Sequence, residues 1–163
     1  MIFVVLGTQK FQCNRLLMEI DRLVEQKIIT EEVFAQRGYS DYVPKYYNSV
    51  DFLKKEEFEE KIGQCSLLIS HSGVGTILSA VNHQKPVIVC PRLKKYKEHV
   101  DDHQLEIGKA FEKKQLVLMY REEADLSELI EQSKSFSFGT YTSQREKVIE
   151  TIKMYLREEI RDV

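Results

Sequence analysis

The sequence has few cysteines, no excess of positive charge and no long apolar run, and each shortage excludes a class of protein. Its three cysteines, Cys13, Cys65 and Cys90, show no C-x-x-C spacing and fit buried thiols in a reducing compartment. The formal net charge of −2 argues against a general nucleic-acid binder, because a phosphate backbone requires a basic face. No segment reaches the roughly 18 apolar residues that cross a bilayer. We therefore expect a cytoplasmic protein whose membrane contacts are made through a partner or an amphipathic surface.

Repeats, low-complexity tracts and linkers are also absent, so the chain is expected to form a single domain, 1–163. The phosphate-binding motif G-x-x-x-x-G-K-[ST] does not occur, which excludes a P-loop ATPase. Gly73 and Gly75 do not extend to G-x-G-x-x-G, because position 78 is Leu78. The nucleophile motif G-x-S-x-G is missing as well.

Strand-like and helix-like segments alternate along the chain. The expected strands are Ile2–Leu6, Val33–Gln36, Val50–Phe52, Leu67–Ser70, Val87–Cys90 and Leu116–Met119. The expected helices are one that carries Leu16, Ile20 and Leu23 on one face, then Glu56–Ile62, Gly75–Asn82, Glu98–Lys113 and Leu126–Gln132. Apolar strands that alternate with helices predict βαβ units and a parallel sheet. The predicted fold is α/β, a Rossmann-like doubly wound parallel sheet of about six strands, with ligands at the carboxyl ends of the strands.

The segment Leu67–Val81 carries the strongest functional signal. An apolar run ends at His71 and Ser72, and Gly73, Gly75 and Thr76 then lead into a helix-compatible stretch. A helix N-terminus that follows such a turn presents unpaired N–H groups and the positive end of the helix dipole, which favour a phosphate. The alternative is a turn that needs glycine only for its backbone angles.

Polar segments also follow the other expected strands: Gly7-Thr8-Gln9, Gln36-Arg37-Gly38, Pro91-Arg92 and Glu98–Gln104. Their convergence on one sheet edge favours a ligand site. His99 and His103 share a helical face and could bind zinc, although no further ligand is evident. The side chains of Asp101–Gln104 are better suited to sugar hydroxyls, while an aspartate there could instead cap a helix. We interpret the pairs Lys54-Lys55, Lys94-Lys95 and Lys113-Lys114 as solvated surface.

Taken together and in this order, the motifs V-V-L-G-T, S-H-S-G-V-G-T-I-L, K-P-V-I-V-C-P-R and E-H-V-D-D-H-Q resemble the C-terminal, donor-binding domain of glycosyltransferase family 28. The resemblance implies half of a two-domain GT-B fold. The most similar members would be short catalytic subunits of split transferases. Those subunits serve bacterial capsular or exopolysaccharide synthesis, or form the soluble half of the dolichol-linked N-acetylglucosaminyltransferase.

The resemblance also implies roles for individual residues. The donor diphosphate would be held by Gly7, Thr8, His71, Ser72, Gly73, Gly75 and Thr76. The donor sugar would contact Asp102, His103 and Gln104, and the nucleoside would contact Phe52, Leu53 and Ser79. The family commonly has Glu or Asp where this chain has Ser79, to pair with the ribose. No metal or other cofactor is implied, and the catalytic base is expected in a partner chain.

The implied activity is that of a UDP-sugar-dependent hexosyltransferase. It would move a hexose, with galactose favoured, from a UDP-sugar to a polyprenyl-diphosphate-linked saccharide. N-acetylglucosamine transfer is one alternative, and a non-catalytic nucleotide-sugar sensor or scaffold is another. The acceptor would be supplied by a membrane-associated partner subunit, which would hold this chain at the inner face of the membrane. An amphipathic helix at about 143–161 either closes the chain's own sheet or docks that partner.

Overall fold

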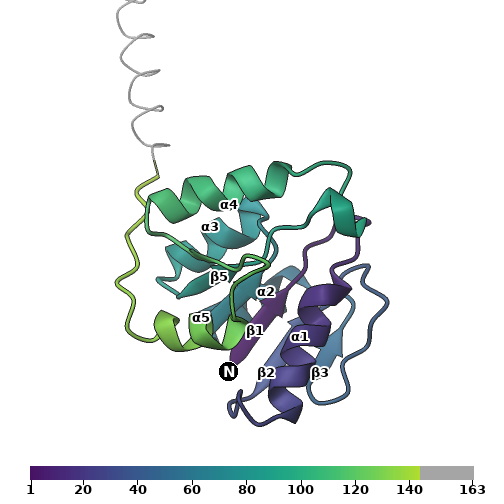
Figure 1. The fold of residues 1–163 in the computed structure, drawn as a ribbon. Helices are drawn as coiled ribbons and strands as arrows, with labels where there is room; N and C mark the ends of the chain where they lie inside the picture. Colours follow the sequence, from purple (N-terminus) through teal and green to yellow (C-terminus); the bar gives the residue numbers. More distant parts are fainter. Residues whose placement is uncertain (144–163) are drawn as a thin grey trace, which may run out of the picture.

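Six strands form one parallel sheet in residues 1–143, the part of the chain that the computed structural model describes (Figure 1). The strands are β1 (Ile2–Val5), β2 (Val33–Gln36), β3 (Asn48–Val50), β4 (Leu67–Ser70), β5 (Val87–Val89) and β6 (Leu118–Met119). Their order is β3-β2-β1-β4-β5-β6, so the chain winds outward from β1 in one direction and then from β4 in the other. Val5 pairs with both Gln36 and Ser70, which brings the ends of β1, β2 and β4 level. This confirms the predicted doubly wound α/β fold.

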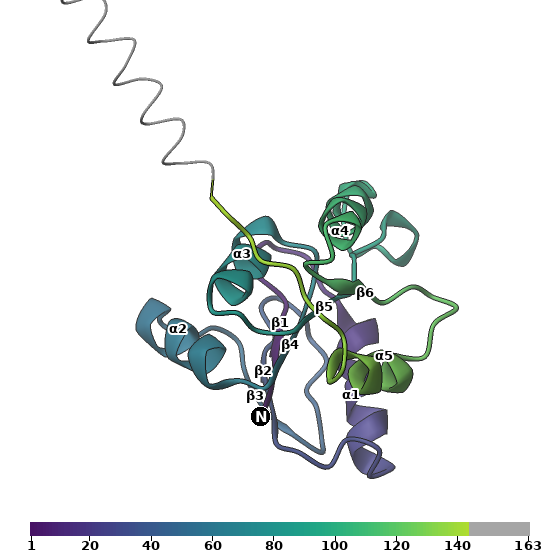
Figure 2. The same ribbon diagram turned by 90° about the vertical axis from the view of Figure 1, so that its left-hand side faces the viewer.

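Helices cover both faces of the sheet (Figure 2). They are α1 (Asn14–Glu25), α2 (Lys55–Gln64), α3 (Val74–Asn82), α4 (His103–Lys113) and α5 (Leu126–Ser133), with a 3₁₀ helix, η1 (Lys94–Tyr96). Helices α1 and α5 pack on one face, and α2 and α3 pack on the other, together with side chains of α4. No helix within residues 1–143 is long and apolar enough to cross a bilayer.

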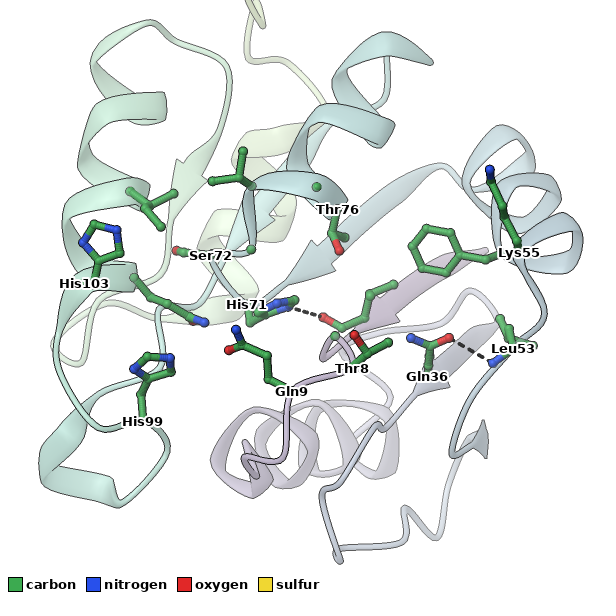
Figure 3. Close-up of a pocket in the computed structure, with 18 residues that line it drawn as sticks. Thr8, Gln9, Gln36, Leu53, Lys55, His71, Ser72, Thr76, His99 and His103 are labelled. Atoms are coloured by element: carbon green, nitrogen blue, oxygen red, sulfur yellow. Dashed lines mark hydrogen bonds between the residues drawn. The ribbon is translucent and has the colours of Figure 1, made fainter.

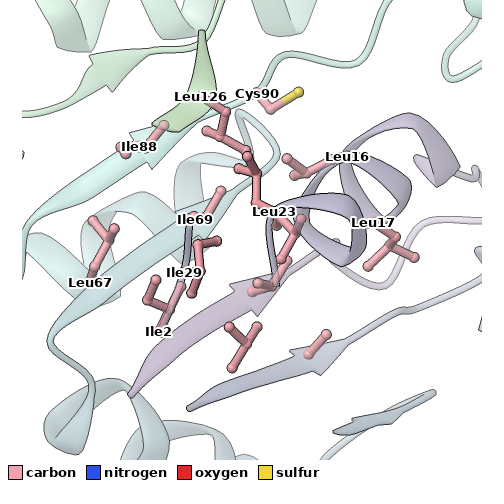
Figure 4. Close-up of a cluster of buried hydrophobic side chains, with 14 of the residues drawn as sticks. Ile2, Leu16, Leu17, Leu23, Ile29, Leu67, Ile69, Ile88, Cys90 and Leu126 are labelled. Carbon is pink, nitrogen blue, oxygen red and sulfur yellow. The ribbon is translucent and has the colours of Figure 1, made fainter. Parts of the chain in front are cut away.

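The alternation of side chains along β1 links the two cores. Ile2 and Val4 belong to the cluster that α1 covers (Figure 4), and Phe3 and Val5 belong to the cluster that α2 and α3 cover. All four side chains are fully buried. Burial of each large apolar side chain stabilises the fold by about 1.5–3 kcal/mol. The central strand is therefore a rigid support for the loop that follows it.

Several predicted boundaries were wrong, among them those of the third strand, the fourth helix and the last strand. The third strand is Asn48–Val50 rather than Val50–Phe52, because the N–H of Leu53 already donates to the side chain of Gln36 instead of a neighbouring strand. The helix expected from Glu98 begins at His103, since Lys97 adopts a left-handed conformation with φ of 56°. The last strand contains only Leu118–Met119. The helix predicted at about 143–161 lies outside the described residues except for its first position.

Candidate functional site

A cavity of about 590 Å³ opens at the carboxyl ends of the strands (Figure 3). The ends of β1 and β2 and the loops after β1, β3 and β4 line it, together with α2, α3 and α4. Its lining residues are Val5, Gly7, Thr8, Gln9, Gln36, Leu53, Lys55, Phe58, His71, Ser72, Gly73, Val74, Gly75, Thr76, His99, His103, Gln104 and Ile107. Within the described residues, 1–143, no aspartate or glutamate is in this lining, which contains histidines and a lysine instead. The cavity therefore suits an anion.

All seven residues predicted to hold a diphosphate line this cavity. Gly73 has extended backbone angles (φ −83°, ψ 122°) and caps α3, whose first turn contains Gly75 and Thr76. The N–H groups of a first helical turn have no partner within the helix, so they are free to bind an anion. The hydroxyl of Ser72 is buried and has no hydrogen-bond partner in the part of the chain that the structure describes. An alanine Cβ at position 108 in α4 would lie 3.0 Å from it.

His71 lies at the base of the turn and is only 7% exposed. Its Nδ1 lies 3.3 Å from the carbonyl oxygen of Val5 and 3.3 Å from Oγ of Ser70. Burial, and after it the nearby positive charge of Arg92, lowers the pKa of His71 to about 4. The ring is therefore uncharged at neutral pH.

Two glycines make room for the His71 ring. An added Cβ at Gly7 would lie 2.6 Å from Nε2 of His71, and one at Gly73 would lie 2.3 Å from the same atom. Gly7 also has a φ of +72°, which side chains rarely adopt. Glycine is thus required at both positions for the close approach of the ring, which is a reason beyond the backbone angles that the sequence suggested.

Two of the residues predicted to contact the sugar line the cavity, His103 and Gln104. They are the first two residues of α4. Gln104 is buried, and its Oε1 accepts a hydrogen bond of 3.0 Å from the backbone N–H of Arg92. This bond fixes the orientation of the amide and leaves its NH₂ group to donate to a ligand.

Asp102, Phe52 and Ser79 are not among the lining residues. The carboxylate of Asp102 accepts a hydrogen bond of 2.9 Å from the backbone N–H of Lys94. Phe52 is 45% exposed and packs edge-on against Tyr39 at 5.3 Å. The hydroxyl of Ser79 donates to the carboxylate of Glu59 in α2, at 3.0 Å to its nearer oxygen. Of the predicted nucleoside contacts, only Leu53 lines the cavity.

The structure adds residues that the sequence analysis did not assign to any part of the nucleotide sugar. Phe58 of α2 lines the cavity and packs edge-on against Phe3 at 5.7 Å. Gln36 is buried, and its Oε1 accepts the N–H of Leu53 at 3.0 Å, so its amide orientation is fixed as well. Lys55, which was interpreted as solvated surface, lies at the cavity wall. Phe58 recurs with Ile62 at helical spacing, a pattern typical of a core residue, so it gave no functional signal.

The pair His99 and His103 lines the cavity, but zinc gains no support from its surroundings. Nδ1 of His99 is 3.0 Å from the carboxylate of Asp101, and its ring packs on Phe11 at 4.7 Å. Within residues 1–143, no group of three or more histidine, cysteine or acidic side chains could hold a metal ion. The same Asp101 carboxylate accepts the N–H of His103 at 3.0 Å, which is the helix-capping role that the sequence left open.

A fully buried arginine supports the floor of the cavity. Nη2 of Arg92 donates to the carbonyl oxygens of Leu6, at 2.5 Å, and Phe11, at 2.9 Å. Its Nε and Nη1 have no hydrogen-bond partner among residues 1–143. Nearby, buried Glu98 accepts two hydrogen bonds from Arg15, at 3.1 and 3.0 Å. Arg15 and Glu98 compensate each other, so the charge of Arg92 adds positive potential beneath the cavity.

The sequence matches the family described as the glycosyltransferase family 28 C-terminal domain over residues 1–155. It is also 38% identical over 64 residues to the UDP-N-acetylglucosamine transferase subunit ALG13 of Eremothecium gossypii. That stretch is 39% of this chain and 30% of the relative.

Solved structures of glycosyltransferases share the fold. Acinetobacter baumannii MurG aligns over 81% of this chain and 40% of its own length, with a TM-score of 0.54 and 16% identity. SnogD from Streptomyces nogalater aligns over 80% of this chain and 34% of its own, with a TM-score of 0.52 and 14% identity. The glycotransferase of kitacinnamycin aligns over 82% of this chain and 34% of its own, with a TM-score of 0.54 and 8% identity. This chain therefore spans well under half the length of these proteins.

Proposed function

The chain belongs to the glycosyltransferase family 28 C-terminal domain family, and from this membership we propose that its cavity binds the donor UDP-sugar of a glycosyl transfer. The composition of the cavity lining carries the proposal. A nucleoside diphosphate is multiply negative, and this lining combines a helix N-terminus with no carboxylate. During transfer the diphosphate leaves with increased negative charge, which fixed donors and a helix dipole stabilise.

The cavity divides into regions that match the parts of a UDP-sugar. Gly7, Thr8 and the turn from His71 to Thr76 would hold the diphosphate in the middle. The sugar would lie toward His103 and Gln104, where a fixed amide can donate to a hydroxyl. The base would lie toward Leu53 and Phe58, which supply apolar surface, and Gln36, which supplies a fixed amide.

N-acetylglucosamine becomes the first candidate for the transferred sugar. The curated relative is a UDP-N-acetylglucosamine transferase subunit, which favours the alternative over the galactose that the sequence analysis put first. Galactose is the second candidate. The saccharide acceptor remains a polyprenyl-diphosphate-linked sugar in this proposal.

A partner subunit would complete the enzyme. This chain spans 40% or less of the similar glycosyltransferase structures, and the relative in Eremothecium gossypii is itself described as a subunit. The partner would bring the membrane-bound acceptor and the catalytic base, since no carboxylate lines the donor cavity. The chain would then work at the cytoplasmic face of a membrane through that partner.

Calorimetric titration of the purified chain tests the donor proposal. UDP-N-acetylglucosamine, UDP-galactose and UDP-glucose are compared with UDP alone and with an ADP-sugar. We expect a UDP-sugar to bind, His71→Ala to abolish binding, and His83→Ala, an exposed histidine outside the cavity, to leave it unchanged. Absence of binding by every UDP compound would refute the proposal. Binding without transfer, in membranes that contain the partner, would favour the sensor alternative.

A further inference from the structure

The tautomer of His71 is fixed by its neighbours. Nδ1 faces two oxygens, the carbonyl of Val5 and Oγ of Ser70, each at 3.3 Å. A carbonyl can only accept, and the Ser70 hydroxyl gives its own hydrogen to the carbonyl of His71 at 2.9 Å, so its oxygen is also an acceptor. Nδ1 therefore carries the proton, and Nε2 holds a bare lone pair in the neutral ring.

That lone pair lies where the anion is expected. Added Cβ atoms at Gly7 and Gly73 would lie 2.6 and 2.3 Å from Nε2, so this nitrogen lies between the two glycines at the centre of the turn. A bare lone pair repels a phosphate oxygen, whereas an N–H at the same place would donate a charge-assisted hydrogen bond to it. The free protein thus presents its turn in a form that opposes the ligand which the rest of the turn favours.

Burial, and after it the groups that face His71, keep the ring neutral until a ligand arrives. Arg92 and His99, from the segment between β5 and α4, both disfavour a positive charge on His71. The loop after β1 and the N-terminus of α3 contribute glycines and hydroxyls, and no carboxylate lines the cavity. A bound diphosphate would be the first negative charge to reach the ring.

We propose that His71 takes up a proton at Nε2 as a diphosphate binds, and so becomes a cationic donor only in the occupied site. The inference rests on the proposed function, since it assumes that the ligand is a UDP-sugar. The proton comes from solvent and returns to it when the ligand leaves. Affinity should therefore rise as the pH falls, by up to about tenfold per pH unit while the free ring is neutral and the bound ring is charged.

Nitrogen-15 NMR of the histidine side chains in the full chain tests this directly. Near neutral pH we expect Nδ1 of His71 to be protonated and Nε2 bare in the free protein, and both to be protonated with saturating UDP-N-acetylglucosamine or UDP-galactose. These diphosphate diesters do not change charge near neutral pH, so the ligand itself supplies no proton. His83, exposed and outside the cavity, is the internal control.

Calorimetry in buffers of different ionisation enthalpy measures the same proton. We expect uptake of about one proton per ligand in the wild type and none in His71→Gln, whose amide is a permanent donor. The affinity of His71→Gln for a UDP-sugar should not depend on pH. If the amide shifts of Gly73 and Gly75 report binding while His71 stays neutral, the inference is refuted and the proposed function is not. The same holds if proton uptake is unchanged in His71→Gln. No shifts with any UDP-sugar would refute the proposed function, and this inference with it.

Discussion

Replacing Gly73 by alanine should remove the His71 ring from its place without straining the backbone. The φ and ψ angles of Gly73, −83° and 122°, are accessible to any residue. The added Cβ, however, would lie 2.3 Å from Nε2 of His71, and real Cβ contacts are essentially never under 3.0 Å. The ring must therefore move, and its Nδ1 contacts with Val5 and Ser70 are lost or stretched.

The cost can be worked out from the same contacts. Overpacking at a well-packed site destabilises by about 1–3 kcal/mol. For a domain of this size each kcal/mol lowers Tm by about 2–4 °C. Loss of one donor to a developing negative charge lowers a reaction rate by about 10²–10³-fold. We therefore expect a folded variant with a modestly lower Tm and severely reduced UDP-sugar binding and transfer.

Gly75→Ala is the matched control for the fold. An added Cβ at Gly75 meets nothing within 4 Å, and alanine is favoured over glycine in a helix by roughly 0.5–1 kcal/mol. The Tm of Gly75→Ala should equal or exceed that of the wild type, whereas the Tm of Gly73→Ala should be lower. In the His71→Ala background, Gly73→Ala should cost almost nothing, because the clash is gone. Equal Tm changes for the two glycines, or additive changes in the double variant, would refute the reasoning.

Three further predictions concern binding and acid stability. Gln104→Ala should weaken UDP-sugar binding about two- to tenfold while UDP binds nearly as before, and equal weakening in calorimetry would contradict the sugar contact. Phe58→Leu should weaken UDP binding about two- to tenfold, and Phe52→Leu should leave it unchanged. If only Phe52→Leu weakens binding, the uracil lies against Phe52 instead. The pKa of His71 is about 4 in the folded chain and 6.5 in a free histidine, so the unfolded chain binds the proton more readily. The free energy of unfolding should therefore fall as the pH falls from 6.5 toward 4, by up to about 1.4 kcal/mol per pH unit. Thermal melts of His71→Gln should lack that part of the slope.

The order of strands and helices was predictable because apolar runs and polar turns alternate with little ambiguity. The turn between β4 and α3 was predictable for the same reason, since Gly73, Gly75 and Thr76 are local to one strand end and one helix start. The tertiary placement of side chains was not. Ser79 follows Thr76 by three residues on α3, yet its hydroxyl bonds to Glu59 on the neighbouring helix. No spacing in the sequence encodes that pairing of α2 with α3.

The nucleoside end of the site shows the same limit. Phe52 and Phe58 both follow β3, and an exposed aromatic residue in a loop is the more obvious candidate for contact with a base. Phe52 packs against Tyr39 and does not line the cavity. Phe58 lines the cavity, because α2 begins at Lys55 and one face of this helix points toward β1. The direction of that helix depends on the packing of Phe58 on Phe3, which is a contact between residues far apart in the sequence.

The buried Arg92 has a consequence for the thermodynamics of ligand capture. Its guanidinium holds two carbonyl oxygens of the loop after β1, and its own backbone N–H holds Gln104 at the opposite wall. Both sides of the cavity are thus tied to one residue before any ligand arrives. These segments lose their conformational entropy during folding, so this loss does not reduce the free energy of ligand binding. Alanine at position 92 has no side-chain donor, so it would leave the carbonyl oxygens of Leu6 and Phe11 without this partner. A chain with alanine at position 92 would have to order the loop anew each time a ligand entered.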